Sequence, residues 1–260
     1  MAVVALFQPG VMGSRLGGEL AAAGHDVRWL APGRSTATSE RASAEGLHPV
    51  DDLTAVFEQA QVCLSVLPPQ AAVDIARLAA GAEFSGTYVD ANPLSPPTLT
   101  EVQATVEKAG AGFVDAGIVG PPPRDARRTH LYLAGEPGTV AMVEALFRGT
   151  RVRPLVVGDT IGQASAAKQS YALFNKGRMV LASLAGNLAA AHGVAQILAG
   201  ESDRPGADLL SELADLDEGL AEVGWRWGPE LEELAVSLEE TGADATAVRG
   251  LVAELARRTG

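Results

Sequence analysis

The sequence predicts an α/β protein in which a mostly parallel, doubly wound sheet is followed by an all-helical region. Short apolar runs alternate with helical segments as far as Gly158, a rhythm typical of parallel strands with helices on both faces. After this point alanine and leucine dominate, and no proline appears from Ile161 to about Leu198. We therefore expect two domains, residues 1–158 and residues 159–260.

The opening strand–turn–helix–strand unit predicts a nucleotide-binding turn. Its apolar run Ala2–Phe7 suits a strand buried on both faces, and Val27–Leu30 reads as the next strand. Between them, Gly10 and Gly13 open a helix that reaches about Ala23. Glycines let a backbone approach a pyrophosphate closely, and a helix N-terminus presents unpaired N–H groups and a positive dipole end to it.

The remaining elements alternate in the same way and then become purely helical. We expect strands at 47–50, 61–66, 87–90, 112–116, 130–134 and 152–157 and helices at 51–60, 70–80, 96–109 and 137–148. In the second domain we expect one long helix or two nearly continuous helices over 161–198, and then helices at 208–221, 229–240 and 243–258. A long, charge-poor helix needs cover on several sides, so we expect a homodimer formed through the helix near 161–198.

The composition limits the kinds of binding partner and the cellular compartment that we expect. The formal net charge of −12 argues against nucleic acid or an anionic membrane surface as a partner and leaves a small-molecule substrate. The one cysteine, Cys63, excludes a disulfide framework and a multi-cysteine metal site, and its apolar surroundings favour a buried thiol. The histidines show no metal-ligand spacing. No uninterrupted apolar stretch is long enough to span a membrane, and the first residues read as a core strand, so we expect a soluble cytoplasmic protein.

The glycine turn departs from the usual G-x-G-x-x-G pattern. Gln8 stands at the first glycine position and is followed by Pro9. Such a turn also fits a tight strand-to-helix connection with no ligand, and the strand–helix–strand context favours nucleotide binding. The residues expected to contact a cofactor here are Gln8, Pro9, Gly10, Val11, Met12 and Gly13.

The end of the second strand favours NADP(H) over NAD. An NAD-binding domain usually places an acid there to bond the ribose hydroxyls, and here no acid appears until Glu40. Arg34, Ser35 and Thr36 follow the strand instead, and Arg34 with Ser35 suits a 2′-phosphate. Ser35 also suits the N-cap of a following helix, and it can serve in both ways.

Four segments carry a family resemblance through their order and spacing. They are GVMG at 10–13, LSVLP at 64–68, DANPLSP at 90–96 and GQASAAK at 162–168. Together they resemble the β-hydroxyacid dehydrogenase superfamily, which includes 3-hydroxyisobutyrate and 6-phosphogluconate dehydrogenases, over about residues 1–190. The later residues look more like a poorly characterised branch with a shorter helical C-terminal domain. The resemblance implies an NADP-binding Rossmann-type domain at 1–158 and a substrate and dimerisation domain at 159–260.

The resemblance makes Lys168 the expected catalytic residue. Small apolar residues surround it in the sequence, and burial lowers the pKa of a lysine, which suits a general acid and base. From the local sequence alone, a lysine whose stem covers apolar surface while its head reaches water fits equally well. Characterised relatives carry an asparagine four residues after this lysine, where this chain has Ala172, and Tyr171 or Asn175 are the expected substitutes.

The substrate side also departs from the family. Relatives hold the substrate carboxylate with a serine-glycine-glycine segment, and the similar stretch here is IVGPPP at 118–123, which lacks the serine. Arg124, Arg127 and Arg128 follow and suit an anion, although a solvated basic loop is the favoured interpretation. Arg226, between two tryptophans better suited to core packing, is a further candidate. The expected substrate contacts are therefore Asn92, Val119 and Gly120, implied by the resemblance, together with Tyr171, Asn175 and Arg226. The expected cofactor contacts implied by the resemblance are Leu67, Pro68 and Asn92.

These observations favour an NADP-dependent oxidoreductase. It would transfer a hydride between the nicotinamide and a small hydroxy acid or the corresponding carbonyl, with Lys168 as general acid and base. Imine reduction is one alternative, because imine reductases share this architecture. A non-catalytic NADP-binding sensor or scaffold protein is the other, kept open by Gln8 and by the missing serine and asparagine.

Overall fold

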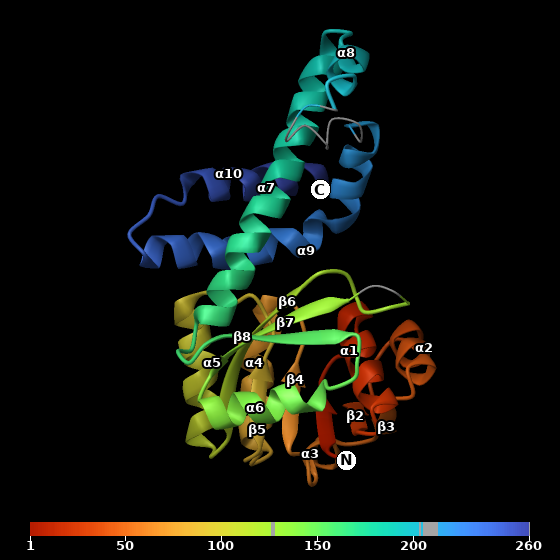
Figure 1. Ribbon diagram of the computed structural model, residues 1–260, viewed down its shortest axis with the longest axis vertical. Coiled ribbons are helices and arrows are strands. Elements are labelled where there is room, and N and C mark those ends of the chain that lie inside the picture. The colour runs from red at the N-terminus through yellow and green to blue at the C-terminus, as the bar shows by residue number, and fades with distance from the viewer. Residues whose placement is uncertain (126–127, 203, 205–212, 260) are drawn as a thin grey trace. The chain divides into compact units, whose positions relative to one another are not determined.

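The computed structural model describes residues 1–125, 128–202, 204 and 213–259, and the chain forms two compact units, Met1–Lys168 and Gln169–Gly260. The division falls inside the long helix α7 (Gln163–Ala191), so the first turns of this helix, with Lys168, belong to the sheet-containing unit (Figure 1).

A single sheet forms the centre of the first unit. Among the described residues it has eight strands in the order β3-β2-β1-β4-β5-β6-β7-β8. The strands are β1 (Val3–Leu6), β2 (Asp26–Leu30), β3 (His48–Val50), β4 (Val62–Ser65), β5 (Thr87–Asp90), β6 (Gly112–Val119), β7 (Thr129–Gly135) and β8 (Val152–Gly158). All neighbours are parallel except β6 and β7, which run antiparallel. The predicted mostly parallel, doubly wound sheet is therefore confirmed.

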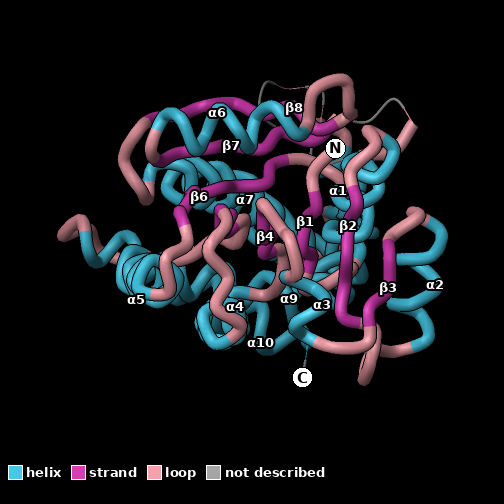
Figure 2. Tube along the Cα trace, turned by 90° about the horizontal axis from the view of Figure 1, so that it is seen from below, coloured by secondary structure: helices cyan, strands magenta, loops and turns pink. Residues whose placement is uncertain are grey.

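Helices cover both faces of this sheet (Figure 2). They are α1 (Val11–Ala22), α2 (Thr36–Ala44), α3 (Leu53–Phe57), the short 3-10 helix η1 (Pro69–Ala71), α4 (Ala72–Gly81), α5 (Pro96–Lys108) and α6 (Pro137–Leu146). One apolar core joins the sheet to α1, α2 and α6, and a second core joins it to α3, α4 and α5. Two cores on opposite faces of one sheet are the packing that the alternating pattern predicts.

Close glycine contacts hold α1 on the sheet. A Cβ on Gly13 would lie 2.3 Å from the carbonyl oxygen of Gln8, and a Cβ on Gly17 would lie 3.0 Å from side-chain carbons of Leu6 and Leu47. Only glycine allows the helix to begin and to pack this close to β1. The start of α1 is therefore fixed relative to the strand that precedes it.

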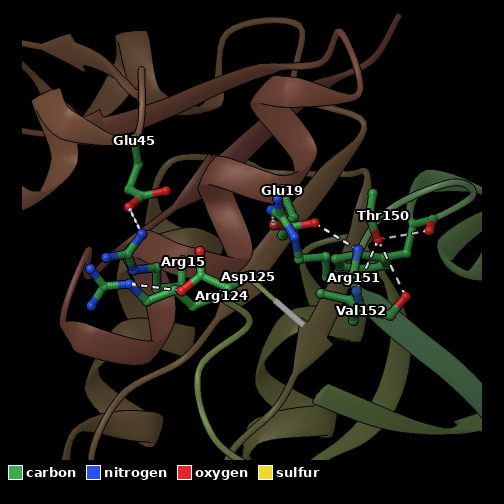
Figure 3. A network of polar contacts seen from close by, with 9 residues as sticks. Arg15, Glu19, Glu45, Arg124, Asp125, Thr150, Arg151 and Val152 are labelled. Carbon is green, nitrogen blue, oxygen red and sulfur yellow. Dashed lines mark hydrogen bonds and ion pairs between the residues drawn. The ribbon is translucent and has the colours of Figure 1, made fainter. Parts of the chain in front are cut away.

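Two ion pairs also hold this helix in place (Figure 3). Glu19 accepts hydrogen bonds from the backbone N–H and the guanidinium of Arg151, both at 2.6 Å. Arg15 lies 2.5 Å from the carboxylate of Glu45. Glu19 is only 8% exposed, whereas the side chain of Arg151 is 53% exposed, so water screens the pair from the side of the arginine. Helix α1 is thus tied to elements far away in the sequence.

The single cysteine behaves as the sequence predicts. Cys63 lies on β4 and is fully buried in the core that contains α3, α4 and α5. Burial, and secondarily the charge of Asp90, raises the pKa of its thiol far above the usual value. A thiol in this state is an inert core group.

The second unit is helical. Besides the rest of α7, its elements are α8 (Ala195–Ala199), α9 (Leu213–Glu240) and α10 (Thr246–Thr259). Helices α9 and α10 pack on each other and on α7 through a core that includes Val180, Leu220, Leu231 and Leu255. Lys176 of α7 is 6% exposed, forms an ion pair with Glu230 of α9, and lies 5.3 Å from the ring centroid of Trp227. This buried cation links the first helix of the unit to the third.

The expected break before Pro229 is wrong. Helix α9 runs through this proline, which removes one backbone hydrogen bond at a cost of about 3 kcal/mol. Leu220 and Leu231, on either side of it, are fully buried in one core, and Glu230 is held by Lys176, so tertiary packing outweighs the local preference. The expected start of a helix at 208 lies outside the described residues, because 205–212 are not described.

Other differences concern shorter segments. Helix α2 begins at Thr36 after the N-cap Ser35, the position at which Ser35 was expected to cap a following helix. Strand β6 continues to Val119, past the expected end at 116, because antiparallel pairing with β7 reaches from Val114 to Val119. The predicted helix over 51–60 is shorter, Leu53–Phe57, and begins after the side chain of Asp52 accepts the backbone N–H of Ala55.

Candidate functional site

The carboxyl ends of the parallel strands bring most of the predicted site residues to one edge of the sheet. β1, β4, β5 and β6 are neighbours and run in the same direction, so the segments that follow them meet at this edge. These segments carry the glycine turn after β1, Leu67 and Pro68 after β4, Asn92 after β5, and Gly120 after β6.

The glycine turn has space for a phosphate. Gly10 is the N-cap of α1, and a Cβ placed on it would meet only Gln8 Cγ, at 4.0 Å. The first turn of the helix contains no acidic residue, and Val11 at its start is 60% exposed although it is apolar. An open helix N-terminus with an uncovered valine is the surface that a dinucleotide pyrophosphate would occupy. The residues present therefore fit the pyrophosphate of a dinucleotide.

Arg34 lies beside this turn. Its guanidinium donates to the carbonyl oxygen of Phe7 at 3.2 Å and, more weakly, to Oε1 of Gln8 at 3.5 Å. Ser35 caps α2, because its Oγ accepts the backbone N–H of Thr38 at 3.3 Å. The cation thus stands where the strand β1 turns into the glycine segment, and the anticipated capping role of Ser35 is confirmed.

Asn92 joins the ends of β4 and β5. It is 1% exposed. Its Oδ1 accepts the backbone N–H of Leu67 at 2.7 Å, its Nδ2 donates to Ser65 Oγ at 2.9 Å, and its own N–H donates to Asp90 Oδ1 at 3.0 Å. The side-chain amide is held by protein groups on both sides, so Asn92 fixes the Leu67–Pro68 turn in place.

Two buried aspartates lie below this edge on neighbouring strands. Asp90 of β5 and Asp115 of β6 are register partners, and both are 0% exposed. Burial raises the pKa of Asp90 to about 7, with a further increase from the charge of Asp115, while the N–H of Asn92 lowers it. Burial also raises the pKa of Asp115, although hydrogen bonds from Ser165, Gly162 and Ala164 oppose this shift. Asp115 is not among the site residues predicted from the sequence, because its contacts with Gly162, Ala164 and Ser165 join segments far apart in the chain.

Lys168 lies against β6. A Cβ on Gly117 would be 2.7 Å from Lys168 Cβ and 2.8 Å from the carbonyl oxygen of Ala164, so α7 crosses the strand at van der Waals contact. Lys168 itself is half-buried. Two residues further along β6 come the buried Val119 and then Gly120, whose φ of +109° suits glycine. The structure therefore brings the lysine to the strand that carries both predicted substrate contacts.

The remaining predicted substrate residues belong to the second unit. Tyr171 follows Lys168 on α7 and is 46% exposed, Asn175 is half-buried on the same helix, and Arg226 is exposed on α9. Their part in a site with Lys168 stays a prediction. The expected core packing of the tryptophans holds for Trp227, which packs against the core of the second unit, and is wrong for Trp225, which is 65% exposed because it lies on the outer side of α9.

The basic loop after β6 is exposed. The side chain of Arg124 is 65% exposed and lies 3.8 Å from the 90% exposed Asp125, a contact too open to contribute much (Figure 3). Arg128 is exposed as well, and Arg127 lies outside the described residues.

In the part of the chain that the structure describes, no group of three or more His, Cys, Asp and Glu side chains is placed to hold a metal ion. None of the described helices combines the length and the apolar character that crossing a membrane requires.

Comparisons with known proteins agree with this geometry. The family profile of the NAD binding domain of 6-phosphogluconate dehydrogenase matches residues 4–152, more than half of the chain. The fold is similar to that of Mycobacterium tuberculosis 3-hydroxyisobutyrate dehydrogenase with L-serine, with a TM-score of 0.78 and 18% identity over 99% of this chain and 93% of that one. A comparison with curated proteins gives no match.

Two further solved structures represent imine chemistry. An imine reductase variant from Myxococcus stipitatus in complex with NAD+ has a TM-score of 0.64 and 15% identity, covering 99% of this chain and 93% of that one. A reductive aminase from Aspergillus terreus in complex with NADPH and ethyl levulinate has a TM-score of 0.58 and 18% identity, with the same coverage of 99% and 93%. At these identities the likeness concerns the fold.

Sequence motifs, sheet order, glycine turn and family profile thus point the same way. The chain belongs to the 6-phosphogluconate dehydrogenase-like family of NAD(P)-binding dehydrogenases and reductases, within the β-hydroxyacid dehydrogenase superfamily.

Proposed function

We propose that this protein is an NADP-dependent oxidoreductase that transfers a hydride between the nicotinamide and a small hydroxy acid or the corresponding carbonyl compound. The observation that carries the proposal is the contact of Lys168 with Gly117 on β6. This contact places the lysine against β6. The carboxyl end of β6 lies at the same edge of the sheet as the glycine turn after β1 and Asn92 after β5.

Hydride transfer and proton transfer require different groups in this reaction. The bound dinucleotide supplies or accepts the hydride. Lys168 moves the proton: its ammonium gives a proton to the carbonyl oxygen during reduction, and its neutral amine takes the proton of the hydroxyl during oxidation. Asn92 keeps the Leu67–Pro68 turn in place on the nicotinamide side, and Val119 and Gly120 border the substrate, with Tyr171, Asn175 and Arg226 as further contacts.

Arg34 supports the choice of NADP(H). A guanidinium beside the first residues after β1 suits a 2′-phosphate, and Ser35 offers a backbone and a hydroxyl next to it. Fluorescence titration with NADPH and NADH tests this choice directly. We expect tighter binding of NADPH, and equal affinities would contradict the assignment of Arg34.

A substrate screen with NADPH consumption tests the reaction class. Hydroxy acids, aldehydes, keto acids and cyclic imines are compared for the wild-type protein and for Lys168→Met. We expect turnover of a hydroxy acid or its carbonyl partner, lost in the variant while the affinity for NADPH stays the same. Equal turnover in the variant would remove the lysine from the mechanism.

Imine reduction is the second candidate, favoured by the structural likeness to an imine reductase and a reductive aminase. An iminium substrate arrives already protonated, so it needs less help from an acid than a carbonyl does. Turnover of cyclic imines that survives in Lys168→Met would therefore favour this candidate. Failure to bind either dinucleotide would refute both enzyme candidates. Binding of NADPH without turnover of any substrate class would favour the third possibility, a non-catalytic NADP-binding sensor or scaffold protein.

The second unit is proposed to bind substrate and to form a homodimer through α7. Leu181, Leu184 and Leu188 are spaced three and four residues apart on this helix and are 61%, 40% and 65% exposed, so they share one apolar face that suits a helix of a second copy. Light scattering after size-exclusion chromatography gives the oligomeric state. We expect a dimer that dissociates in a Leu181→Glu, Leu188→Glu double variant. The cytoplasmic location remains a proposal from the composition.

A further inference from the structure

A single side chain of the sheet, Asp115, accepts the hydrogen bonds of the N–H groups at the start of α7. Oδ2 of Asp115 accepts the backbone N–H groups of Gly162, Ala164 and Ser165 at 2.9, 2.9 and 3.1 Å, and Oδ1 accepts the hydroxyl of Ser165 at 2.6 Å. Helices usually satisfy these N–H groups with a capping residue of their own chain segment. Here a fully buried carboxylate of β6 does so from 47 to 50 residues away.

The backbone before the helix is shaped for this contact. Gly162 has a φ of +101°, a left-handed conformation that glycine adopts without strain, and its N–H is one of the three that reach Asp115. An anionic acceptor suits the position because the N-terminal N–H groups carry the positive end of the helix dipole.

Gly117, two residues after Asp115 on the same strand, is the point at which β6 contacts Lys168. Asp115 and Gly117 point to the same face of β6, because side chains alternate along a strand. Lys168 follows Ser165 by three residues, a little less than one helical turn and about 4.5 Å along the helix axis. A Cβ at Gly117 would lie 2.7 Å from Lys168 Cβ. The strand therefore fixes the helix at two successive levels, the capping turn and the turn of the lysine.

We propose that Asp115 is a positioning residue for Lys168, holding the first turn of α7 at the height and rotation from which the lysine amine reaches the reacting atoms. This inference rests on the proposed function, in which Lys168 moves the proton. Gly117 contributes to the same positioning, because the absence of a side chain there lets α7 lie in contact with β6.

Lysine labelling tests the positioning without any substrate. The chain has three lysines, and the exposed Lys108 on α5 serves as an internal reference. The full-length protein is treated with limiting acetic anhydride, and mass spectrometry gives the ratio of acetylation at Lys168 to that at Lys108. In Asp115→Ala the ratio should rise several-fold, because the lysine loses its fixed place on Gly117. An unchanged ratio in this folded variant overturns the proposal.

Conservative and matched variants separate positioning from general loss of stability. Asp115→Asn keeps an oxygen that accepts the N–H groups and should restore most of the wild-type ratio. Glu136→Ala removes the cap of α6, where Glu136 accepts the N–H groups of Gly138 and Thr139, and should leave the ratio unchanged. If Asp115→Ala does not fold, Ser165→Ala removes one of the four bonds and should raise the ratio to a smaller extent, and no rise would overturn the proposal.

Kinetics with the substrate found in the screen distinguish this inference from the proposed function. Asp115→Ala should lower kcat by on the order of a hundredfold with little change in the KM for NADPH, because misplacing a catalytic group acts on the chemical step. In a Lys168→Met background the same substitution should change kcat no further. Full activity of Lys168→Met refutes the proposed function, whereas an inactive Lys168→Met together with a fully active Asp115→Ala refutes the positioning role alone.

Discussion

Replacing Asp90 with asparagine should change how the stability of the protein depends on pH. The side chain is fully buried, and burial raises its pKa to about 7 from a usual value of 3.8. The unfolded chain therefore loses this proton at lower pH than the folded chain. Since the folded state binds more protons between these two values, the stability contributed by this group is present below pH 3.8 and is lost as the pH rises toward 7.

The size of the effect follows from the two pKa values. With 3.8 in the unfolded chain and about 7 in the folded one, this group lowers the free energy of unfolding by about 2.5 kcal/mol between roughly pH 5 and roughly pH 8. The asparagine side chain of the variant cannot ionise, and its oxygen can still accept the N–H of Asn92. The Asp90→Asn variant should therefore gain about 2.5 kcal/mol relative to the wild type across this interval.

Urea unfolding at a series of pH values measures this difference. Trp29 is 2% exposed on β2, and its fluorescence follows the first unit when Trp225 and Trp227 of the second unit are replaced by phenylalanine in every protein compared. Asp51→Asn provides the control, because Asp51 is an exposed aspartate of the same unit and its replacement removes one charge without changing the core. Parallel stability curves for the wild type and Asp90→Asn would refute the assigned effect of burial.

Three further substitutions test the cofactor turn and the second unit. Arg34→Ala should weaken NADPH binding by about tenfold or more and leave NADH binding almost unchanged in fluorescence titrations, and equal losses for both would contradict a 2′-phosphate contact. Gly13→Ala should destabilise the first unit by about 1–3 kcal/mol in thermal unfolding, because the new Cβ meets the carbonyl oxygen of Gln8 at 2.3 Å; an unchanged Tm would argue against this contact. Lys176→Met breaks the ion pair with the mostly buried Glu230 and should cost about 3–5 kcal/mol in calorimetry, so a stable variant would mean that the pair is dispensable.

Structural features that depend on residues close together in the sequence were predictable. The turn from Gly10 to Gly13 and the alternation of apolar runs with helices indicated the sheet, because parallel strands and their helices have local signatures. The position of Lys168 on a helix after the last strand also followed from its motif. Each of these depends on neighbours within a few residues.

Features that join distant segments were not predictable. Asp115 caps α7 across 47 to 50 residues, and the only trace of this contact in the sequence is Gly162, whose positive φ the contact uses. The helix break predicted before Pro229 is wrong for the same reason. A proline locally favours the end of a helix, but burial of Leu220 and Leu231 on either side of it stabilises a continuous α9. Contacts of this kind depend on the completed fold.

The inert thiol of Cys63 makes the chain convenient for spectroscopy. Because the one native sulfhydryl is buried and holds its proton firmly, a cysteine introduced at the surface would be the sole position that a maleimide dye attaches to in the folded protein. Two such positions, one replacing Lys108 and one replacing Trp225, would carry a donor and an acceptor fluorophore on different units. Energy transfer between them would report how far apart the two units stand in solution, and whether adding NADPH changes that separation.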